Sequence, residues 1–303
     1  LFLVGMTEAN AVNGVFARFT IPMNTNQLPA ESVNWPADAG GTRFNGVALI
    51  TNGLYVAGDS FARTRDTTAT KDTQGIVVSF HQNSLTNSGE NLGSRWDTQI
   101  TGEVFGGAEE MLAVATTFEG NTAYVYTTGK AEDTVSTSRL KLAKLNTSGT
   151  EIWKIADAGS AATAVTAGHG VVAYNNFVYV AGVSDESGVS RPILAMFQAS
   201  DGTEVGRVTL VGTNPGQFNA LVLNGGYLYA VGSENALSGS AADFLVVKYD
   251  PATLAEVWTA KFTMDLGDED ILYGVAAVGD RLYAVGSSVQ AGRGKDGIVI
   301  ELR

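Results

Sequence analysis

The stretch Leu54-Tyr-Val-Ala-Gly58 decides the fold, because close copies of it recur along the whole chain. The phrase occurs six times, and its copies begin at Leu1, Leu54, Val125, Val178, Leu228 and Leu282. The glycines that end successive copies are 53, 71, 53, 50 and 54 residues apart. A period near fifty residues, with one strand-like phrase in each unit, is typical of a β-propeller in which each unit forms one blade.

Each unit also contains three further strand-like stretches. Before the phrase, a small apolar stretch such as 46–50 leads into Asn52-Gly53, a dipeptide that favours the tight turn of a β-hairpin. After the phrase, an alternating stretch such as 243–249 predicts a third strand. A fourth strand follows and carries one tryptophan in four of the units, at Trp35, Trp96, Trp153 and Trp258. Because these tryptophans recur at one place per unit, we interpret them as packing residues between blades.

These strands predict an all-β fold, a six-bladed β-propeller with four antiparallel strands per blade. Leu1 enters at a second strand and Arg303 follows a third strand, so we expect the terminal blades to be incomplete, with 22 strands in the chain. We therefore expect residues 1–303 to form a single propeller domain that is a segment of a longer protein. The alternative is a ring that closes imperfectly between the two termini.

The composition narrows the classes of function. The chain has 303 residues with 19 Lys and Arg against 31 Asp and Glu, a net charge of −12, which disfavours binding to nucleic acid and to anionic membranes. No stretch approaches the ~20 apolar residues of a membrane-spanning helix. There is no cysteine, which excludes disulfides, thiolate catalysis and cysteine-ligated zinc. Two histidines, His81 and His169, leave little material for a histidine-rich metal site.

The repeat unit resembles bacterial-type β-propeller repeats of the SBBP and delta-60 kind and, more distantly, PQQ-like propellers. The likeness is carried by the Tyr-(Val/Ala)-(Ala/Val)-Gly phrase, by the stretch 243–250 (Asp-Phe-Leu-Val-Val-Lys-Tyr-Asp), and by Glu151-Ile-Trp153 and Glu256-Val-Trp258. The resemblance implies a propeller fold, which occurs in many secreted and surface proteins, and it assigns no activity. PQQ enzymes typically have a vicinal cysteine pair and eight blades, so PQQ binding is disfavoured.

In a propeller the innermost strand of each blade begins at the mouth of the central channel, where ligands usually bind. Aligning the units on the repeated glycine places one column of residues there, namely Asn45, Leu112, His169, Asn219 and Tyr273. Carboxylate and amide side chains precede the column at Glu109, Glu110, Gln217, Glu269 and Asp270. One pocket could therefore collect oxygen-bearing groups from several blades.

Oxygen ligands of this kind suit Ca²⁺ or Mg²⁺ better than zinc. If Ca²⁺ binds, we predict that its ligands are Asn45, Glu110, Asn219 and Asp270, with His169 as the base of a hydrolase. The set is similar, in residue type alone, to the Glu/Asn/Asn/Asp set in the channel of six-bladed calcium-dependent lactonases and gluconolactonases. The alternative is a polar, water-lined channel without a cofactor, in which His169 is only a hydrogen-bonded residue.

Two further motifs have both a functional and a structural interpretation. The run 265–270 (Asp-Leu-Gly-Asp-Glu-Asp) could bind Ca²⁺ at the surface, but it lacks the spacing and the terminal Glu of an EF-hand loop, and a solvated acidic turn is the alternative. Asn146-Thr147-Ser148 is a glycosylation sequon in a turn between two expected strands, so we predict Asn146 as a glycosylation site.

Two functions from different classes follow. The first, which we favour, is a non-catalytic extracellular interaction or structural module of a secreted or cell-surface assembly. It would bind protein or glycan partners, including other domains or subunits of the same assembly. The second is a Ca²⁺-dependent lactonase- or esterase-like hydrolase with its site in the central channel. The first follows from the acidic composition and from the lack of a recognisable nucleophile motif such as Gly-x-Ser-x-Gly.

Overall fold

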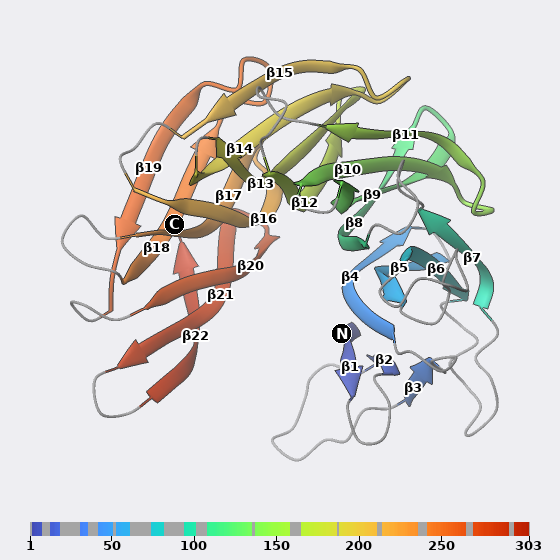
Figure 1. Cartoon of the computed structure of the whole chain (residues 1–303), viewed down its shortest axis with the longest axis horizontal. Helices are drawn as coiled ribbons and strands as arrows, with labels where there is room; N and C mark the ends of the chain where they lie inside the picture. The colour runs from blue at the N-terminus through green and yellow to red at the C-terminus, as the bar shows by residue number, and fades with distance from the viewer. Residues whose placement is uncertain are drawn as a thin grey trace. The chain divides into compact units, whose positions relative to one another are not determined.

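The computed structural model describes residues 2–7, 13–18, 31–35, 42–50, 53–60, 74–81, 94–100, 108–134, 137–157, 165–186, 188–210, 214–235, 241–264, 269–290 and 294–302 (Figure 1). The chain divides into two compact units, Leu1–Asp157 and Ala158–Arg303. In the described part of the chain, each unit contains three antiparallel sheets. Within these ranges no helix is long and apolar enough to cross a membrane.

The first unit has one three-stranded and two four-stranded sheets. The three-stranded sheet contains β1 (Phe2–Thr7), β2 (Asn13–Arg18) and β3 (Glu31–Trp35). The next contains β4 (Thr42–Ile50), β5 (Gly53–Ser60), β6 (Gln74–His81) and β7 (Ser94–Ile100). The last contains β8 (Glu109–Glu119), β9 (Thr122–Thr134), β10 (Thr137–Asn146) and β11 (Glu151–Asp157).

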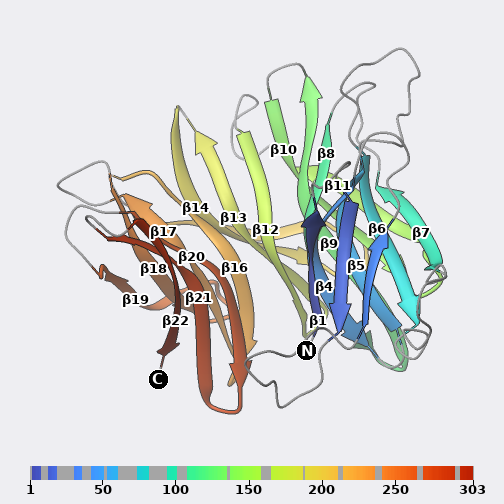
Figure 2. The same cartoon turned by 90° about the horizontal axis from the view of Figure 1, so that it is seen from below.

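The second unit has two four-stranded sheets followed by a three-stranded one. The first contains β12 (Val165–Tyr174), β13 (Phe177–Glu186), β14 (Val189–Gln198) and β15 (Glu204–Thr209). The second contains β16 (Gly216–Asn224), β17 (Tyr227–Asn235), β18 (Ala242–Tyr249) and β19 (Glu256–Phe262). The third contains β20 (Asp270–Val278), β21 (Arg281–Gln290) and β22 (Gly294–Leu302). In every sheet, strands that are consecutive in the chain lie side by side, as Figure 2 shows for β12, β13 and β14.

The all-β class, the antiparallel four-stranded unit and the β-propeller fold are confirmed, but the prediction of six blades is wrong. That number came from counting copies of one phrase, and each copy marks a single strand rather than a finished blade. The described residues form 22 strands, which is enough for five four-stranded blades and fewer than the 24 that six would need, so the blade count is corrected to five. The sheets at the two ends of the described chain have three strands each.

A β-bulge occurs at the same place in the first strand of each of the five sheets from β4–β7 onward. The register of the pairing shifts at the residues Asn45, Leu112, His169, Asn219 and Tyr273. A bulge inserts one extra residue into a strand and re-aims its side chain. The sequence alignment that put these five residues in one column is therefore confirmed, and their shared feature is the bulge.

The repeated glycine is explained by the same bulge. In the β4–β7 sheet, a Cβ on Gly58 would overlap the backbone carbonyl oxygen of Arg43, two residues before the bulge residue. In the β16–β19 sheet, a Cβ on Gly232 would overlap the carbonyl oxygen of Gln217 in the same way. The phrase therefore ends in glycine because the neighbouring strand approaches too closely for any side chain.

The core is formed by neighbouring sheets that pack face to face. In the first unit, buried residues of β4–β7 contact buried residues of β8–β11, in a cluster of Tyr55, Ala57, Val77, Ile100, Met111, Val125, Ala143 and Leu145. In the second unit, Phe244 and Val246 of β18 lie in one cluster with Leu272 and Ala284 of the last sheet. Trp258 packs against that cluster, which supports its predicted role between blades. The side chains of Trp35 and Trp96 lie outside the described residues.

In each of two sheets, a lysine side chain lies over a tyrosine ring. In β10, Lys144 Nζ lies 4.0 Å from the ring centroid of Tyr124 and forms an ion pair with Glu119 at 2.8 Å. In β18, Lys248 Nζ lies 4.0 Å from the ring centroid of Tyr227. Both contacts have the geometry of a cation–π interaction, in which the ring face attracts the ammonium group. Tyr124 and Tyr227 thus have a structural role beside these lysines.

Candidate functional site

Three bulge residues use their side chains to join neighbouring sheets. Asn45 Nδ2 donates to the carbonyl oxygen of Met111 at 3.0 Å, and Asn219 Nδ2 donates to that of Leu272 at 2.8 Å. The ring Nδ1 of His169 lies 2.8 Å from the carbonyl oxygen of Phe218. In each case the acceptor is the residue directly before the bulge of the following sheet. We call each of these hydrogen bonds a bulge strap.

The strap fixes one tautomer of His169. A carbonyl oxygen only accepts hydrogen bonds, so Nδ1 carries the proton that His169 shares with Phe218. Nδ1 is therefore not available as a base, and any proton transfer by His169 would have to use Nε2. The role of His169 as a base stays a prediction.

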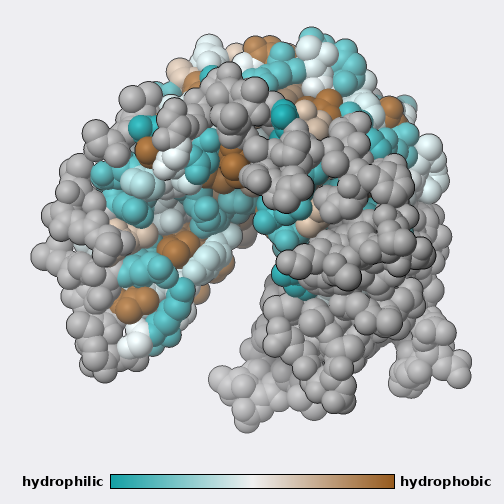
Figure 3. All heavy atoms as spheres, viewed as in Figure 1, coloured by the Kyte–Doolittle hydropathy of each residue, from teal (hydrophilic) through white to brown (hydrophobic). Residues whose placement is uncertain are grey.

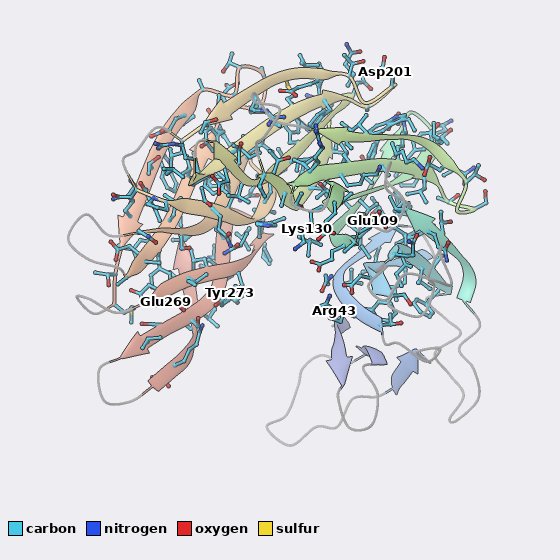
Figure 4. All side chains as sticks on the ribbon, viewed as in Figure 1. Arg43, Glu109, Lys130, Asp201, Glu269 and Tyr273 are labelled. Atoms are coloured by element: carbon cyan, nitrogen blue, oxygen red, sulfur yellow. The ribbon has the colours of Figure 1, made fainter. Side chains whose placement is uncertain are left out.

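At the bulge end of the first unit, Arg43, Asp59, Glu110 and Lys130 form a charged network, called here the Arg43 network. Arg43 Nη2 lies 2.9 Å from Asp59 Oδ2 and 3.5 Å from Glu110 Oε1, and Lys130 Nζ lies 3.2 Å from Glu110 Oε2. Asn45 Nδ2 is 3.3 Å from Asp59 Oδ1, so Asn45 belongs to the same group. Figure 4 labels Arg43 and Lys130 there. The network connects β4 and β5 with β8 and β9.

Burial governs the protonation of Asp59. Its side chain is only 1 % exposed, and this burial raises its pKa although Arg43 and Asn45 favour the charged form. The carboxylate of Glu110, at 24 % exposure, lies between two cations. Each charge therefore has an opposite charge or an amide beside it, an arrangement that holds two sheets together.

At the bulge end of the second unit, Asp270 is fully buried at the start of β20. Its Oδ2 accepts hydrogen bonds from Thr263 Oγ1 at 2.8 Å and from the Met264 amide at 2.9 Å. Its Oδ1 has no hydrogen-bond partner within the described part of the chain. Burial raises the pKa of nearby Asp243, and the charges of Asp270 and Glu234 raise it further. The last residue of the predicted acidic run is thus a buried structural group, while residues 265–268 lie outside the described residues.

The four predicted Ca²⁺ ligands fall into two groups, one in each unit. Glu110 is part of the Arg43 network of the first unit, and Asn45 is hydrogen-bonded to it through Asp59. Asn219 and Asp270 belong to the second unit, where Asn219 Oδ1 accepts a hydrogen bond from Gln217 Nε2 at 2.6 Å. Both ends of the Asn219 amide are therefore occupied by protein groups, which fits a strap better than a metal ligand. Of the residues that the structure describes, no three Asp, Glu or His side chains are placed to hold a metal ion together. The Ca²⁺ site stays a prediction.

Tyr273, the bulge residue of the last sheet, differs from the residues that form straps. The residue is 50 % exposed, and its hydroxyl oxygen accepts hydrogen bonds from Lys295 Nζ at 3.2 Å and from Ser287 Oγ at 3.3 Å. Lys295 Nζ also lies 3.2 Å from Glu269 Oε1. Its hydrogen bonds with Tyr273 and Glu269 raise the pKa of Lys295. We call Tyr273, Ser287, Lys295 and Glu269 the Tyr273 cluster; Figure 4 labels Tyr273 and Glu269.

Asn146 of the sequon closes the turn between β10 and β11. Its Oδ1 accepts hydrogen bonds from the amide and hydroxyl of Ser148 at 3.0 and 2.8 Å, and from the amide of Thr150 at 2.9 Å. In the corresponding turn after β18, Asp250 Oδ1 accepts hydrogen bonds from the backbone amides of Ala252 and Thr253. A carboxylate serves this purpose as well as an amide does, so the turn alone explains an Asx residue here. Glycosylation of Asn146 stays a prediction.

Sequence reasoning missed the cations of both clusters. Arg43, Lys130 and Lys295 were not singled out, because their partners lie on other strands and are found only from the pairing register. One signal was present, since Asp59 and Lys130 both directly follow the repeated glycine and so occupy equivalent positions. That alignment predicts opposite charges on neighbouring sheets.

Comparison with known proteins supports the fold and leaves the activity open. No family model matches the chain, and no curated protein sequence matches it. Among solved structures, Kuenenia stuttgartiensis hydrazine synthase is similar with a TM-score of 0.56 and 11 % identity, over 91 % of this chain and 70 % of that one. The Neurospora crassa Pan2 WD40 domain gives 0.49 and 12 %, over 85 % and 60 %. A thermostable family-43 glycoside hydrolase gives 0.46 and 14 %, over 88 % and 92 %. At such identities the likeness concerns the fold alone: the chain is a β-propeller protein.

Proposed function

We propose that this β-propeller is a non-catalytic extracellular module that binds glycan or protein partners in a secreted or cell-surface assembly. The observation that carries the proposal is the set of bulge straps. Asn45, His169 and Asn219 are three of the five residues predicted to act at the channel, and each of these three is hydrogen-bonded to a backbone carbonyl of the next sheet. Side chains fixed in this way stabilise the fold and leave binding to the exposed groups beside them.

The remaining polar groups at the bulge ends also suit binding better than catalysis. In the Arg43 network the two carboxylates contact cations, and in the second unit Asp270 holds the backbone of Met264. A hydrolase needs a carboxylate or histidine free to exchange a proton with its substrate. In contrast, the exposed Tyr273 cluster offers an aromatic ring beside an ammonium and a carboxylate, which is the composition of a polar binding surface.

The experiment compares binding with turnover on the same preparation. The purified chain is applied to a glycan array and, separately, incubated with 4-nitrophenyl acetate and with δ-gluconolactone, each with added Ca²⁺ and with EDTA. We expect glycan binding that is the same in both conditions, and no hydrolysis above the rate in buffer. Hydrolysis that requires Ca²⁺ and is lost in Asn219→Ala would overturn the proposal and favour the channel enzyme.

The strap supplies an internal control for this comparison. Asn219→Ala removes the side chain that a channel enzyme would use as a ligand, yet under our proposal it affects only stability. Binding measured well below the melting temperature of the variant should therefore equal that of the unmodified chain. Loss of binding in Asn219→Ala, with the fold intact by circular dichroism, would contradict the proposal.

A further inference from the structure

We propose that the Tyr273 cluster binds one neutral pyranose sugar, with the sugar ring against the Tyr273 ring and two adjacent hydroxyl groups on Lys295 and Glu269. This inference rests on the proposed function and names the ligand class for one of its surfaces.

The aromatic ring of Tyr273 is exposed at a bulge. Tyr273 is 50 % exposed, whereas Tyr55, Tyr126 and Tyr179 of the repeated phrase are at most 1 % exposed. A tyrosine ring is a rigid apolar surface with a polar tip, and such rings recur in binding sites because little conformational freedom is lost on contact. The carbon-bound hydrogens on one face of a pyranose form a flat apolar patch of similar size. An exposed ring at the position of the straps is thus a surface open to a ligand.

The contacts of the Tyr273 hydroxyl determine which further hydrogen bond this group can form. Lys295 Nζ and Ser287 Oγ both donate to the phenolic oxygen. With two hydrogen bonds accepted, the remaining capacity of this group is its own proton. The two donors come from β21 and β22, so they hold the ring in place from within the sheet. The hydroxyl is therefore oriented to donate one hydrogen bond outward.

A hydrogen-bond donor, Lys295, and an acceptor, Glu269, lie side by side next to the ring. Lys295 Nζ is 3.2 Å from Glu269 Oε1, and their side chains are 50 % and 49 % exposed. An ammonium group only donates hydrogen bonds, and a carboxylate only accepts them. Two adjacent sugar hydroxyls can satisfy both, since each hydroxyl donates one hydrogen bond and accepts others. Charge-assisted bonds of this kind are stronger than bonds between neutral groups.

The charges of the Tyr273 cluster and of the whole chain favour a neutral sugar over an acidic one. The charges of Lys295 and Glu269 cancel, and the chain as a whole carries −12. A uronate or a sulfated sugar would place its anion near Glu269 in the field of an acidic protein. A neutral sugar meets no such repulsion. Figure 3 shows hydrophilic and hydrophobic residues interspersed over the described surface of this view.

The experiment uses three neutral probes and one acidic probe. The full chain is titrated with methyl β-D-glucopyranoside, methyl β-D-galactopyranoside, methyl α-D-mannopyranoside and sodium D-glucuronate, with saturation-transfer NMR and calorimetry as readouts. We expect saturable binding of at least one methyl pyranoside and weaker binding of glucuronate. Tyr273→Ala should weaken the pyranoside by about fiftyfold, because the stacking surface, worth about tenfold, and the hydroxyl, worth about fivefold, are both lost. Tyr273→Phe should weaken it by about fivefold, because only the hydroxyl is lost.

The matched control is another exposed tyrosine that faces a lysine. Tyr227 is 36 % exposed, and Lys248 lies 4.0 Å from its ring centroid, but Lys248 forms no ion pair with a described carboxylate. Tyr227→Ala should therefore leave pyranoside binding unchanged. Glu269→Gln should narrow the difference between pyranoside and glucuronate, because it removes the negative charge and keeps a hydrogen-bonding side chain.

The outcomes separate this inference from the proposed function. If no methyl pyranoside binds, or if Tyr273→Ala binds as tightly as the unmodified chain, the assignment of the Tyr273 cluster is wrong. The proposed module survives in both cases when the chain still binds the glycan array, or binds a protein partner, without turnover. The module itself is overturned by metal-dependent hydrolysis, or by loss of binding in a folded Asn219→Ala variant.

Discussion

The side-chain amide of Asn219 donates a 2.8 Å hydrogen bond to the backbone carbonyl of Leu272, and this bond joins β16 to β20 across two sheets. Leu272 is fully buried, so its carbonyl oxygen has little access to water. A buried acceptor that loses its partner keeps the full cost of desolvation. The bond therefore matters more for stability than its length alone indicates.

Asn219→Ala should lower the free energy of unfolding by about 1–3 kcal/mol, because the carbonyl of Leu272 is left unpaired in the core. Urea-induced unfolding followed by tryptophan fluorescence measures the change. Asn235→Ala is the matched control, since the side chain of Asn235 makes no hydrogen bond to another described residue, and it should change stability by less than about 0.5 kcal/mol. Equal losses in the two variants would contradict the strap.

Gly232→Ala should destabilise the protein by about 3 kcal/mol, because the new methyl group would overlap the carbonyl oxygen of Gln217 and force the bulge apart. Gly297→Ala, in β22, is the control: apart from Gly297 and its two chain neighbours, no described residue has an atom within 4 Å of the place that the new methyl group would take, and the backbone of Gly297 is not in the left-handed region. Thermal unfolding by calorimetry compares the two. A Gly232→Ala variant with unchanged melting temperature would show that the strands can move apart freely.

Burial of Tyr179 gives stability a defined dependence on alkaline pH. Its hydroxyl donates to the carbonyl of Pro251 at 3.0 Å, and burial raises its pKa to about 12 from 10.0. Because the folded-state pKa is the higher one, the contribution of the neutral phenol is fully present below pH 10 and is lost as the pH rises through 12.

Tyr179→Phe should therefore make stability less sensitive to pH between 10 and 12 than in the unmodified chain. Chemical unfolding at a series of pH values measures this slope, and the absorbance of tyrosinate identifies the titrating group. Parallel slopes in both proteins would show that Tyr179 does not titrate in this range.

Lys144→Met should cost more stability than Lys248→Met. Both lysines lie over tyrosine rings, but Lys144 is 4 % exposed and also pairs with Glu119. Removing Lys144 leaves Glu119 without this cation, at a cost of about 3 kcal/mol. The loss at Lys248 should be about 1 kcal/mol, the size of a cation–π contact. A double-mutant cycle with Glu119→Gln isolates the ion pair, and a coupling energy near zero would remove the reason for the difference.

Much of the fold could be predicted from the sequence because its repeat is local. The Tyr-x-x-Gly phrase, the hairpin turns and the alternating stretches each report the geometry of one strand, and the alignment of Asn45, His169 and Asn219 in one column followed from the glycine. The blade count could not be obtained this way, since a phrase marks one strand and does not report whether a sheet is complete.

The candidate site was harder to predict because it depends on register. Whether an asparagine binds a ligand or a carbonyl is decided by the neighbouring sheet, so Asn219 has the residue type of a metal ligand and the contacts of a strap. Lys295 and Tyr273 are 22 residues apart and meet only because β20 and β22 flank β21. No pattern within a single strand shows such a pair.

In every bulge strap the donor comes before the acceptor in the sequence, and this order determines when each strap can form during protein synthesis. Each donor precedes its acceptor in the chain, by 66 residues for Asn45, 49 for His169 and 53 for Asn219. A ribosome therefore always delivers the donor first. In each of the three straps, the donor side chain therefore stays without its partner until the first strand of the following sheet has been synthesised, so these three pairs of sheets are joined in order from the amino end.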